Sequence, residues 1–205
     1  MNRPASGMTL VEILVAAAIL SLLLLAILGI YVMGSKVFYR TDVQSELVSA
    51  LQVTSARLGR DLRQSVYASL SITPDGRALS CLLPADPEGT VEFDQEGEVE
   101  WQSYAIWYHD AATDRVFRRQ LPLLPGARQR REPGPLEKYN PGGGARPLRD
   151  YLLEGQLVAR SISGFRASVP AGTRRLQLSL VALKQAYGKD EPERMMLRTS
   201  VRPRN

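Results

Sequence analysis

Residues 7–33 read GMTLVEILVAAAILSLLLLAILGIYVM, and this stretch decides how the rest of the chain is organised. The run from Ile13 to Met33 holds 21 residues without a charge, which make a helix of about 32 Å at 1.5 Å per residue. That length matches the hydrocarbon core of a bilayer, which is about 30 Å thick. We therefore predict a membrane-spanning helix and assign residues 8–35 to it.

Two ordinary kinds of apolar N-terminal segment fit this stretch poorly. A secretory signal peptide has a shorter apolar region, followed by a cleavage site with small residues of the A-x-A type. Here the apolar run is too long, and no such site follows it closely. A plain membrane anchor fits the length but gives no reason for Glu12, since a carboxylate at the centre of a span costs about 2.5–3.5 kcal/mol.

A third interpretation uses the whole pattern from Gly7 to Ala16. The sequence GMTLVEILVA resembles the prepilin cleavage and methylation motif of type IV pilins and type II secretion pseudopilins. It combines a glycine before the cut, a hydrophobic residue after it, the sequence Thr9-Leu10-Val11-Glu12 and an unbroken apolar helix. The resemblance implies that prepilin peptidase removes residues 1–7 as a leader by cutting between Gly7 and Met8. The same enzyme then N-methylates Met8, where family members usually carry Phe.

The same resemblance gives Glu12 a physical role in assembly. Removal of the leader leaves an ammonium group on Met8, and an opposite charge within about 4–6 Å stabilises a buried carboxylate. In the family this Glu pairs with the terminal amine of a neighbouring subunit, so Thr9, Leu10, Val11 and Glu12 form the expected assembly segment. The resemblance also implies a cytoplasmic N-terminus in the inner membrane. The flanking charges do not favour that orientation by themselves.

The helix is expected to continue well beyond the apolar run. Leucines recur at spacings of 4, 7 and 4 from Leu47 through Leu51 and Leu58 to Leu62, the pattern of an amphipathic helix. No proline interrupts before Pro74, so one helix is predicted from about Thr9 to Val66, about 85 Å long. Its first half is apolar all round, and residues 36–70 carry one apolar stripe suited to packing on a sheet. Two glycines weaken the helix, which suits either close packing or local stretching in a filament: Gly29 and Gly34.

Residues 71–205 carry strand patterns separated by turn signals and predict an antiparallel sheet. With the helix on one face of this sheet, the fold class is α+β, a long N-terminal helix on a β-rich head. A further short element is expected within Asp150–Val158. The expected strands are Ala78–Leu83, Thr90–Asp94, Val99–Tyr108, Val116–Gln120, Ser161–Val169, Arg175–Leu183 and Arg194–Val201.

The range Pro122–Leu148 interrupts this pattern. It holds six prolines, five glycines and few apolar residues, so burial is not expected to offset the entropy of ordering it. We expect a flexible, solvated insertion at 122–148. Its basic residues Arg128, Arg130 and Arg131 suggest an alternative function, a DNA-uptake or adhesion module that contacts an acidic partner. The simpler interpretation is a solvated loop, and nucleic acid is not the expected partner.

Composition excludes several other classes of function. The chain has 205 residues, a net charge of +5, one cysteine and one histidine, so no internal disulfide and no histidine cluster can form. His109, Asp110 and Asp114 are interpreted as a turn rather than a metal site, and Cys81 as a small buried hydrophobe. The acidic residues between 86 and 100 are interpreted as the outer face of a hairpin rather than a calcium site. No enzyme activity, metal or cofactor is expected.

The C-terminus suggests a subgroup within the family. Residues 197–205, LRTSVRPRN, resemble the last strand and Arg-Asn ending of W-type minor pilins and J-type minor pseudopilins. Ile162–Arg166 and Leu58–Gln64 fit the same subgroup. The resemblance implies a structural minor subunit that helps to initiate or cap a type IV pilus or a type II secretion pseudopilus. Its implied partners are other major and minor pilins or pseudopilins, prepilin peptidase and the inner-membrane assembly platform.

Overall fold

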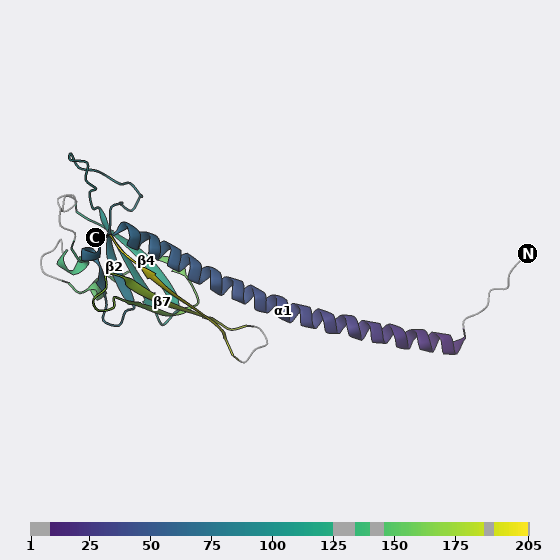
Figure 1. Ribbon diagram of the computed structural model, residues 1–205. Coiled ribbons are helices and arrows are strands. Elements are labelled where there is room, and N and C mark those ends of the chain that lie inside the picture. Colours follow the sequence, from purple (N-terminus) through teal and green to yellow (C-terminus); the bar gives the residue numbers. More distant parts are fainter. Residues whose placement is uncertain (1–8, 125–133, 140–145, 187–190, 205) are drawn as a thin grey trace, which may run out of the picture.

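A single long helix dominates the computed structural model, which describes residues 9–124, 134–139, 146–186 and 191–204. Helix α1 runs from Leu10 to Gln64 over 55 residues, a length of about 83 Å. Figure 1 shows its N-terminal half projecting alone from a β-rich head, which packs around its C-terminal half. The predicted α+β architecture, a long apolar N-terminal helix on an antiparallel β head, is therefore confirmed.

The C-terminal half of α1 is held by the apolar stripe that the sequence predicted. Leu47, Leu58 and Leu62 have no exposed surface, and Leu51 is 5% exposed. Leucine is a strong helix former, and full burial of its side chain contributes about 1.5–3 kcal/mol. The helix ends at Gln64, and the backbone N–H of Ser65 still donates to the carbonyl of Asp61.

Five antiparallel strands form the larger sheet, in the order β1-β2-β3-β4-β5. Each strand pairs with the one before it in the sequence, as in a meander. A β-bulge interrupts the last pairing between Val116 and Phe117. The strands are β1 (Ser71–Ile72), β2 (Ala78–Leu83), β3 (Ser103–Asp110), β4 (Arg115–Pro122) and β5 (Gln156–Ala159).

Both faces of this sheet are covered at its centre. Along β2, Leu79 and Cys81 belong to the core beneath α1, whereas Ala78 and Leu82 belong to a second core on the opposite face. Strand β3 alternates in the same way. Because successive side chains of a strand point to opposite faces, the continuous apolar sequence of β2 reflects burial on both sides.

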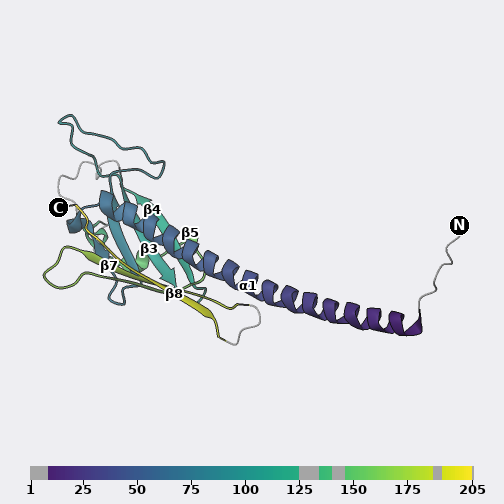
Figure 2. The same cartoon turned by 45° about the vertical axis from the view of Figure 1, so that its right-hand side comes forward.

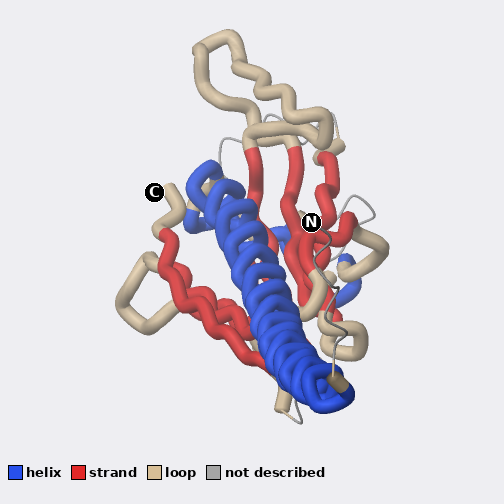
Figure 3. Tube along the Cα trace, turned by 90° about the vertical axis from the view of Figure 1, so that its right-hand side faces the viewer, coloured by secondary structure: helices blue, strands red, loops and turns tan. Residues whose placement is uncertain are grey.

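Three further strands form a separate sheet, in the order β6-β7-β8, where the sequence predicted only one sheet. They are β6 (Ile162–Ser168), β7 (Leu176–Lys184) and β8 (Glu193–Val201). Figure 3 shows α1 between the two sheets. The sheets meet at β6, where the N–H of Ala167 donates to the carbonyl of Gly76 over 2.8 Å and the N–H of Ile162 donates to Asp114 over 3.0 Å.

Glycine is required at one of these junctions. Gly76 has φ +70°, and a Cβ atom added there would lie 2.7 Å from the carbonyl oxygen of Ala167. Any larger residue would strain the left-handed backbone and also push β6 away from the β1–β2 turn. The glycine therefore allows the two sheets to approach each other.

Part of the insertion is packed on the head, which the expectation of a solvated loop did not include. Leu136, Tyr139 and Leu148 are at most 4% exposed and cover the second core of the larger sheet. The hydroxyl of Tyr104 donates to the carbonyl of Gly134 over 2.6 Å. These three side chains cover the outer face of β2 and β3, which the composition of the range did not indicate.

The acidic residues before β3 form a projecting loop rather than a regular strand. Thr90–Asp94 was expected to be a strand, and this is wrong: only isolated bridges occur, Ala85 with Val91 and Phe93 with Val99. We call residues 84–102 the acidic arm. Figure 2 shows it standing clear of the head at the end where α1 terminates. The alternation of apolar and acidic residues does not produce a strand here, and Val91 and Phe93 stay exposed.

A buried polar cluster joins α1 to the larger sheet. The Asp61 carboxylate accepts a hydrogen bond from Trp107 Nε1 over 2.9 Å and one from Arg118 Nε over 2.8 Å. Trp107 and Arg118 lie directly opposite each other on β3 and β4. Only 8% of the Asp61 side chain is exposed, against 22% for Arg118. The cluster favours one rotation of α1 on the sheet, because a single carboxylate accepts from donors on two neighbouring strands.

Replacing Asp61 by Ala is expected to lower the free energy of unfolding of the head by about 2–3 kcal/mol. The change leaves the buried indole N–H and the guanidinium of Arg118 without their acceptor. Thermal unfolding of the full chain in detergent, followed by circular dichroism, measures the loss. Asp42→Ala on the exposed side of α1 is the matched control, expected within about 0.5 kcal/mol of wild type. Equal stability of the two variants would contradict this role for Asp61.

Candidate functional site

The first turn of α1 is organised by Thr9 and Glu12. The Thr9 backbone N–H donates to Glu12 Oε2 over 2.8 Å, and its hydroxyl donates to the same oxygen over 3.0 Å. The Glu12 N–H in turn donates to Thr9 Oγ1 over 3.4 Å, which completes a capping box. This arrangement satisfies two donors that a helix start would otherwise leave free. It also holds the carboxylate at the very beginning of the helix, in the environment that the positive end of the helix dipole favours.

The other residues of the predicted processing and assembly segment lie around this turn. Leu10 and Val11 are 76% and 66% exposed, so both remain available for contacts outside the chain. Gly7 and Met8 lie outside the described residues. The structure therefore brings Thr9 and Glu12 into direct contact, an arrangement that the sequence-based account of Glu12 as a partner for an amine had not considered.

The apolar run that follows has no cover from the head. Every residue from Leu10 to Gly34 is exposed, and α1 is long and apolar enough to cross a membrane. Soluble monomers rarely expose a continuous apolar surface of this size, so it marks contact with lipid or with other helices. The Ser21 hydroxyl donates to the carbonyl of Ala17 over 2.8 Å, which satisfies a polar group within the run.

Both glycines of the run lie in unbroken helix. A Cβ atom added at Gly29 or Gly34 would meet nothing within 4 Å in this chain. Packing within the chain therefore does not account for either glycine. Either alternative from the sequence therefore stays open, contact with other helices or a local weakening of α1.

Two ion pairs, which sequence patterns had not revealed, bind α1 to the hairpin of β7 and β8. Arg40 Nε lies 3.2 Å from Glu193 Oε1, and Lys184 is paired with Glu46. The partners are far apart in the sequence, so no local pattern could connect them. Both pairs lie where the helix enters the head. They mark the boundary between its apolar half and its packed half.

Two of the three segments that suggested a subgroup meet at the far end of α1. The N–H of Tyr67 donates to the carbonyl of Arg204, and the N–H of Arg204 donates to Ser65, both over 2.9 Å. A Cβ atom at Gly59 would lie 3.9 Å from a methyl group of Val201. The C-terminal segment thus fastens the end of α1, which is a structural role.

The residues considered for metal binding serve the β3–β4 turn, as interpreted from the sequence. Asp110 accepts the Thr113 hydroxyl over 2.6 Å and the Ala112 N–H over 3.0 Å. These bonds, the one from Thr113 first, lower the pKa of Asp110. The His109 ring points away, with Nε2 2.6 Å from the carbonyl oxygen of Ile162. Among the described residues no group of three or more His, Cys, Asp or Glu side chains is placed to hold a metal ion.

The sole cysteine is a core residue, as predicted. Cys81 has no exposed surface. Burial, followed by the nearby Asp61 carboxylate, raises the pKa of its thiol far above the usual value. A thiol held in its protonated form and shielded from solvent is a poor nucleophile. The basic residues proposed for partner contact, Arg128, Arg130 and Arg131, lie outside the described residues.

Comparison with known proteins finds one similarity, and it falls on the segment described above. A family model, the prokaryotic N-terminal methylation motif, matches residues 2–28. This match covers the capping box and most of the exposed apolar run. No curated protein and no solved structure matches the chain.

Proposed function

The chain carries the N-terminal methylation motif of the type IV pilin-like family, and from this premise we propose that it is a minor pilin or minor pseudopilin. Such a subunit helps to initiate or cap a type IV pilus or a type II secretion pseudopilus. One observation carries the proposal: from Leu10 on, the matched segment is an apolar helix that the head leaves uncovered. A surface of this kind needs lipid before assembly and other helices after it.

The proposed processing removes residues 1–7 and leaves a methylated amine on Met8. The motif makes the chain a substrate of prepilin peptidase, and the cut between Gly7 and Met8 is our assignment. The described helix begins at Leu10, and two residues, Met8 and Thr9, lie between that bond and the helix. A cut there would therefore remove only the segment in front of the helix and leave the spanning run intact.

Glu12 is proposed to neutralise the terminal amine of a neighbouring subunit. Within one chain its carboxylate is bound to Thr9, one residue from the new terminus, and stays exposed to other molecules. In the apolar interior of a filament an unpaired carboxylate would be costly, and a nearby ammonium group offsets that cost. The capping box then has a second role besides closing the first turn, because it holds the Glu12 carboxylate at a fixed position at the start of α1.

Membrane anchoring follows from the same helix, and the finer localisation is part of the proposal. The N-terminus lies in the cytoplasm, α1 crosses the inner membrane once, and the head lies on the periplasmic side. The partners are other pilins or pseudopilins, prepilin peptidase and the assembly platform. The W-type or J-type subgroup rests on the C-terminal resemblance, and the role is structural rather than catalytic.

Replacing Gly7 by Val is expected to block processing, because the branched side chain obstructs the bond to be cut. The variant should keep residues 1–7 and an unmethylated Met8, whereas the wild-type chain should begin with N-methylated Met8. Mass spectrometry of the N-terminal peptide from membrane-purified protein distinguishes the two. Gly29→Val, within the exposed run where a Cβ meets nothing, is the matched control and should be processed normally. A wild-type chain that retains residues 1–7 would contradict the assignment.

Two substitutions at Glu12 separate its charge from its capping role. Glu12→Gln keeps an amide oxygen that can accept the Thr9 N–H but loses the charge, whereas Glu12→Ala loses both. If the charge pairs with a neighbouring amine, both variants insert into the membrane but enter filaments at least tenfold less, as measured by immunoblot of sheared filaments. Asp42→Asn removes one charge from the exposed side of α1 and should assemble normally. If Glu12→Gln enters filaments as well as wild type does, the proposed charge pairing is contradicted and only the capping role of Glu12 remains.

A further inference from the structure

The outward face of the smaller sheet is basic. Alternation along β8 points five residues away from α1, and all are exposed: Arg194, Met196, Arg198, Ser200 and Arg202, the last just beyond the strand. Arginines four residues apart on a strand are separated by about 13 Å. Met196 lies between the first two and is 47% exposed. The face therefore presents a line of guanidinium groups interrupted by one apolar side chain.

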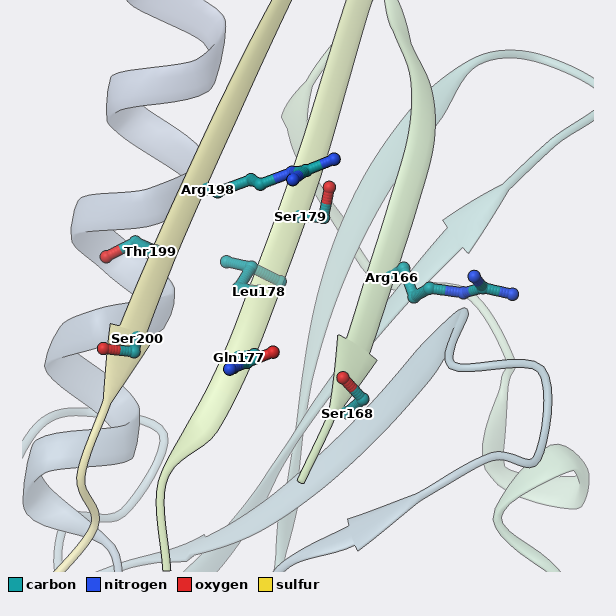
Figure 4. A pocket seen from close by; sticks show the side chains of 8 residues that line it. All are labelled: Arg166, Ser168, Gln177, Leu178, Ser179, Arg198, Thr199 and Ser200. Carbon is teal, nitrogen blue, oxygen red and sulfur yellow. The ribbon is translucent and has the colours of Figure 1, made fainter. Parts of the chain in front are cut away.

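Strand β6 adds a fourth arginine across the sheet. Arg166 pairs with Ser179 on β7, and Ser179 pairs with Arg198 on β8. The two arginines thus flank the serine at about 10 Å from each other, given strands about 4.8 Å apart. Figure 4 shows this row at a shallow groove, with Arg198 extended toward Ser179. Of the residues in β6, β7 and β8, only Glu193 is acidic; it lies on the opposite face, where it pairs with Arg40.

The acidic arm carries the complementary features. Residues 84–102 hold seven acidic residues and no basic one. Hydrogen bonds within the arm hold its shape, and each of the four has a length of 2.9 Å. The N–H of Asp94 donates to the carbonyl of Glu98, and the N–H of Glu100 donates to the carbonyl of Glu92. Asp94 Oδ1 accepts the N–H groups of Glu96 and Glu98. Two apolar side chains are exposed among these charges, Phe93 by 62% and Val91 by 40%.

We propose that the acidic arm of one copy docks on the basic outward face of β6, β7 and β8 of a second copy. Carboxylates of the arm would meet Arg166, Arg194 and Arg198, and Phe93 would cover Met196. Figure 3 shows the arm at the upper end of the larger sheet and the smaller sheet on the opposite side of α1, so the two surfaces of one copy lie apart. They are two different patches, and contacts of this kind join subunits head to tail and continue into a chain.

The chemistry favours an acidic protein segment over a nucleic acid as the occupant. Single-stranded nucleic acids bind where aromatic side chains stack on bases, and the outward residues of this face include no aromatic side chain. Exposed ion pairs are individually weak, so several must act together with the apolar contact. Association should therefore fall as salt rises, because exposed charges are screened within about 10 Å at 0.1 M salt. The inference goes beyond the proposed function and does not depend on it.

The test uses the full chain in lipid nanodiscs that hold one copy each, so that only the heads can meet. Association between discs is measured by fluorescence for wild type and for two charge reversals. Arg194→Glu with Arg198→Glu reverses two charges of the face, and Glu88→Lys with Glu98→Lys reverses two charges of the arm. We expect each reversed chain alone to associate at least tenfold more weakly than wild type. A mixture of the two should recover association, because the unaltered arm of the face variant can then meet the unaltered face of the arm variant.

A control and a second measurement keep the result specific. Arg57→Glu with Arg60→Glu changes the net charge equally on an exposed part of α1 and should not alter association. Mixing Phe93→Cys discs with Met196→Cys discs and adding a mild oxidant should give disulfide-linked dimers, and the buried Cys81 should not take part. Unchanged association of either reversed chain, or no recovery in the mixture, would overturn the proposal. Loss of DNA binding by the face variant, without any effect on self-association, would overturn it in favour of nucleic acid.

Discussion

The apolar surface of the first half of α1 sets the conditions for everything else in the molecule. It is exposed along its whole length in a single chain, so the protein reaches a stable state only with lipid or other helices around it. The head cannot supply that cover, because it packs on the C-terminal half of the same helix. One continuous helix therefore lies in two environments. Its first half is apolar on all sides, and its second half has one apolar stripe that packs on the head.

The head is built to hold the second half of α1 in one rotation and at one depth. The leucine stripe buries one side of the helix, but a stripe alone tolerates small rotations and shifts. Asp61 removes that freedom, because Trp107 and Arg118 reach it only from neighbouring positions on two strands. Where the helix enters the head, the ion pair of Arg40 with Glu193 adds a further contact between α1 and β8. The continuous helix connects the head to the first turn and so to Glu12.

Periodic features were predictable from the sequence, and contacts between distant residues were not. The single helix, strand β2 and the strand pairs β3–β4 and β7–β8 follow from local patterns, although β3 begins at Ser103 and not at Val99 as predicted. The division into two sheets depends on β6 pairing with β7 while touching the turns at Gly76 and Asp114, which no local signal shows. The burial of Asp61 was not predicted either, because its partners Trp107 and Arg118 are distant in the sequence. The burial of Leu136 and Leu148 was hidden because their segment has the composition of a loop.

At the site, the sequence identified the motif but not its geometry. Thr9 and Glu12 were picked out as assembly residues, and the structure adds that they bind each other. That contact was visible in principle, since Thr followed by Glu three residues later is the signature of a capping box. The resemblance predicted only a contact between Glu12 and a neighbouring subunit, and not the contact with Thr9.

The most direct measurement of the central claim is a cysteine-accessibility scan of α1 in sealed membrane vesicles. Single cysteines are placed from position 14 to 46 and treated with a membrane-impermeant maleimide; Cys81 contributes no background while the head is folded. In vesicles that carry the head on their outer side, we expect protection from 14 to 33 and labelling on the exposed side of α1 beyond Lys36. Uniform labelling along the helix would show that lipid does not cover the apolar half of α1.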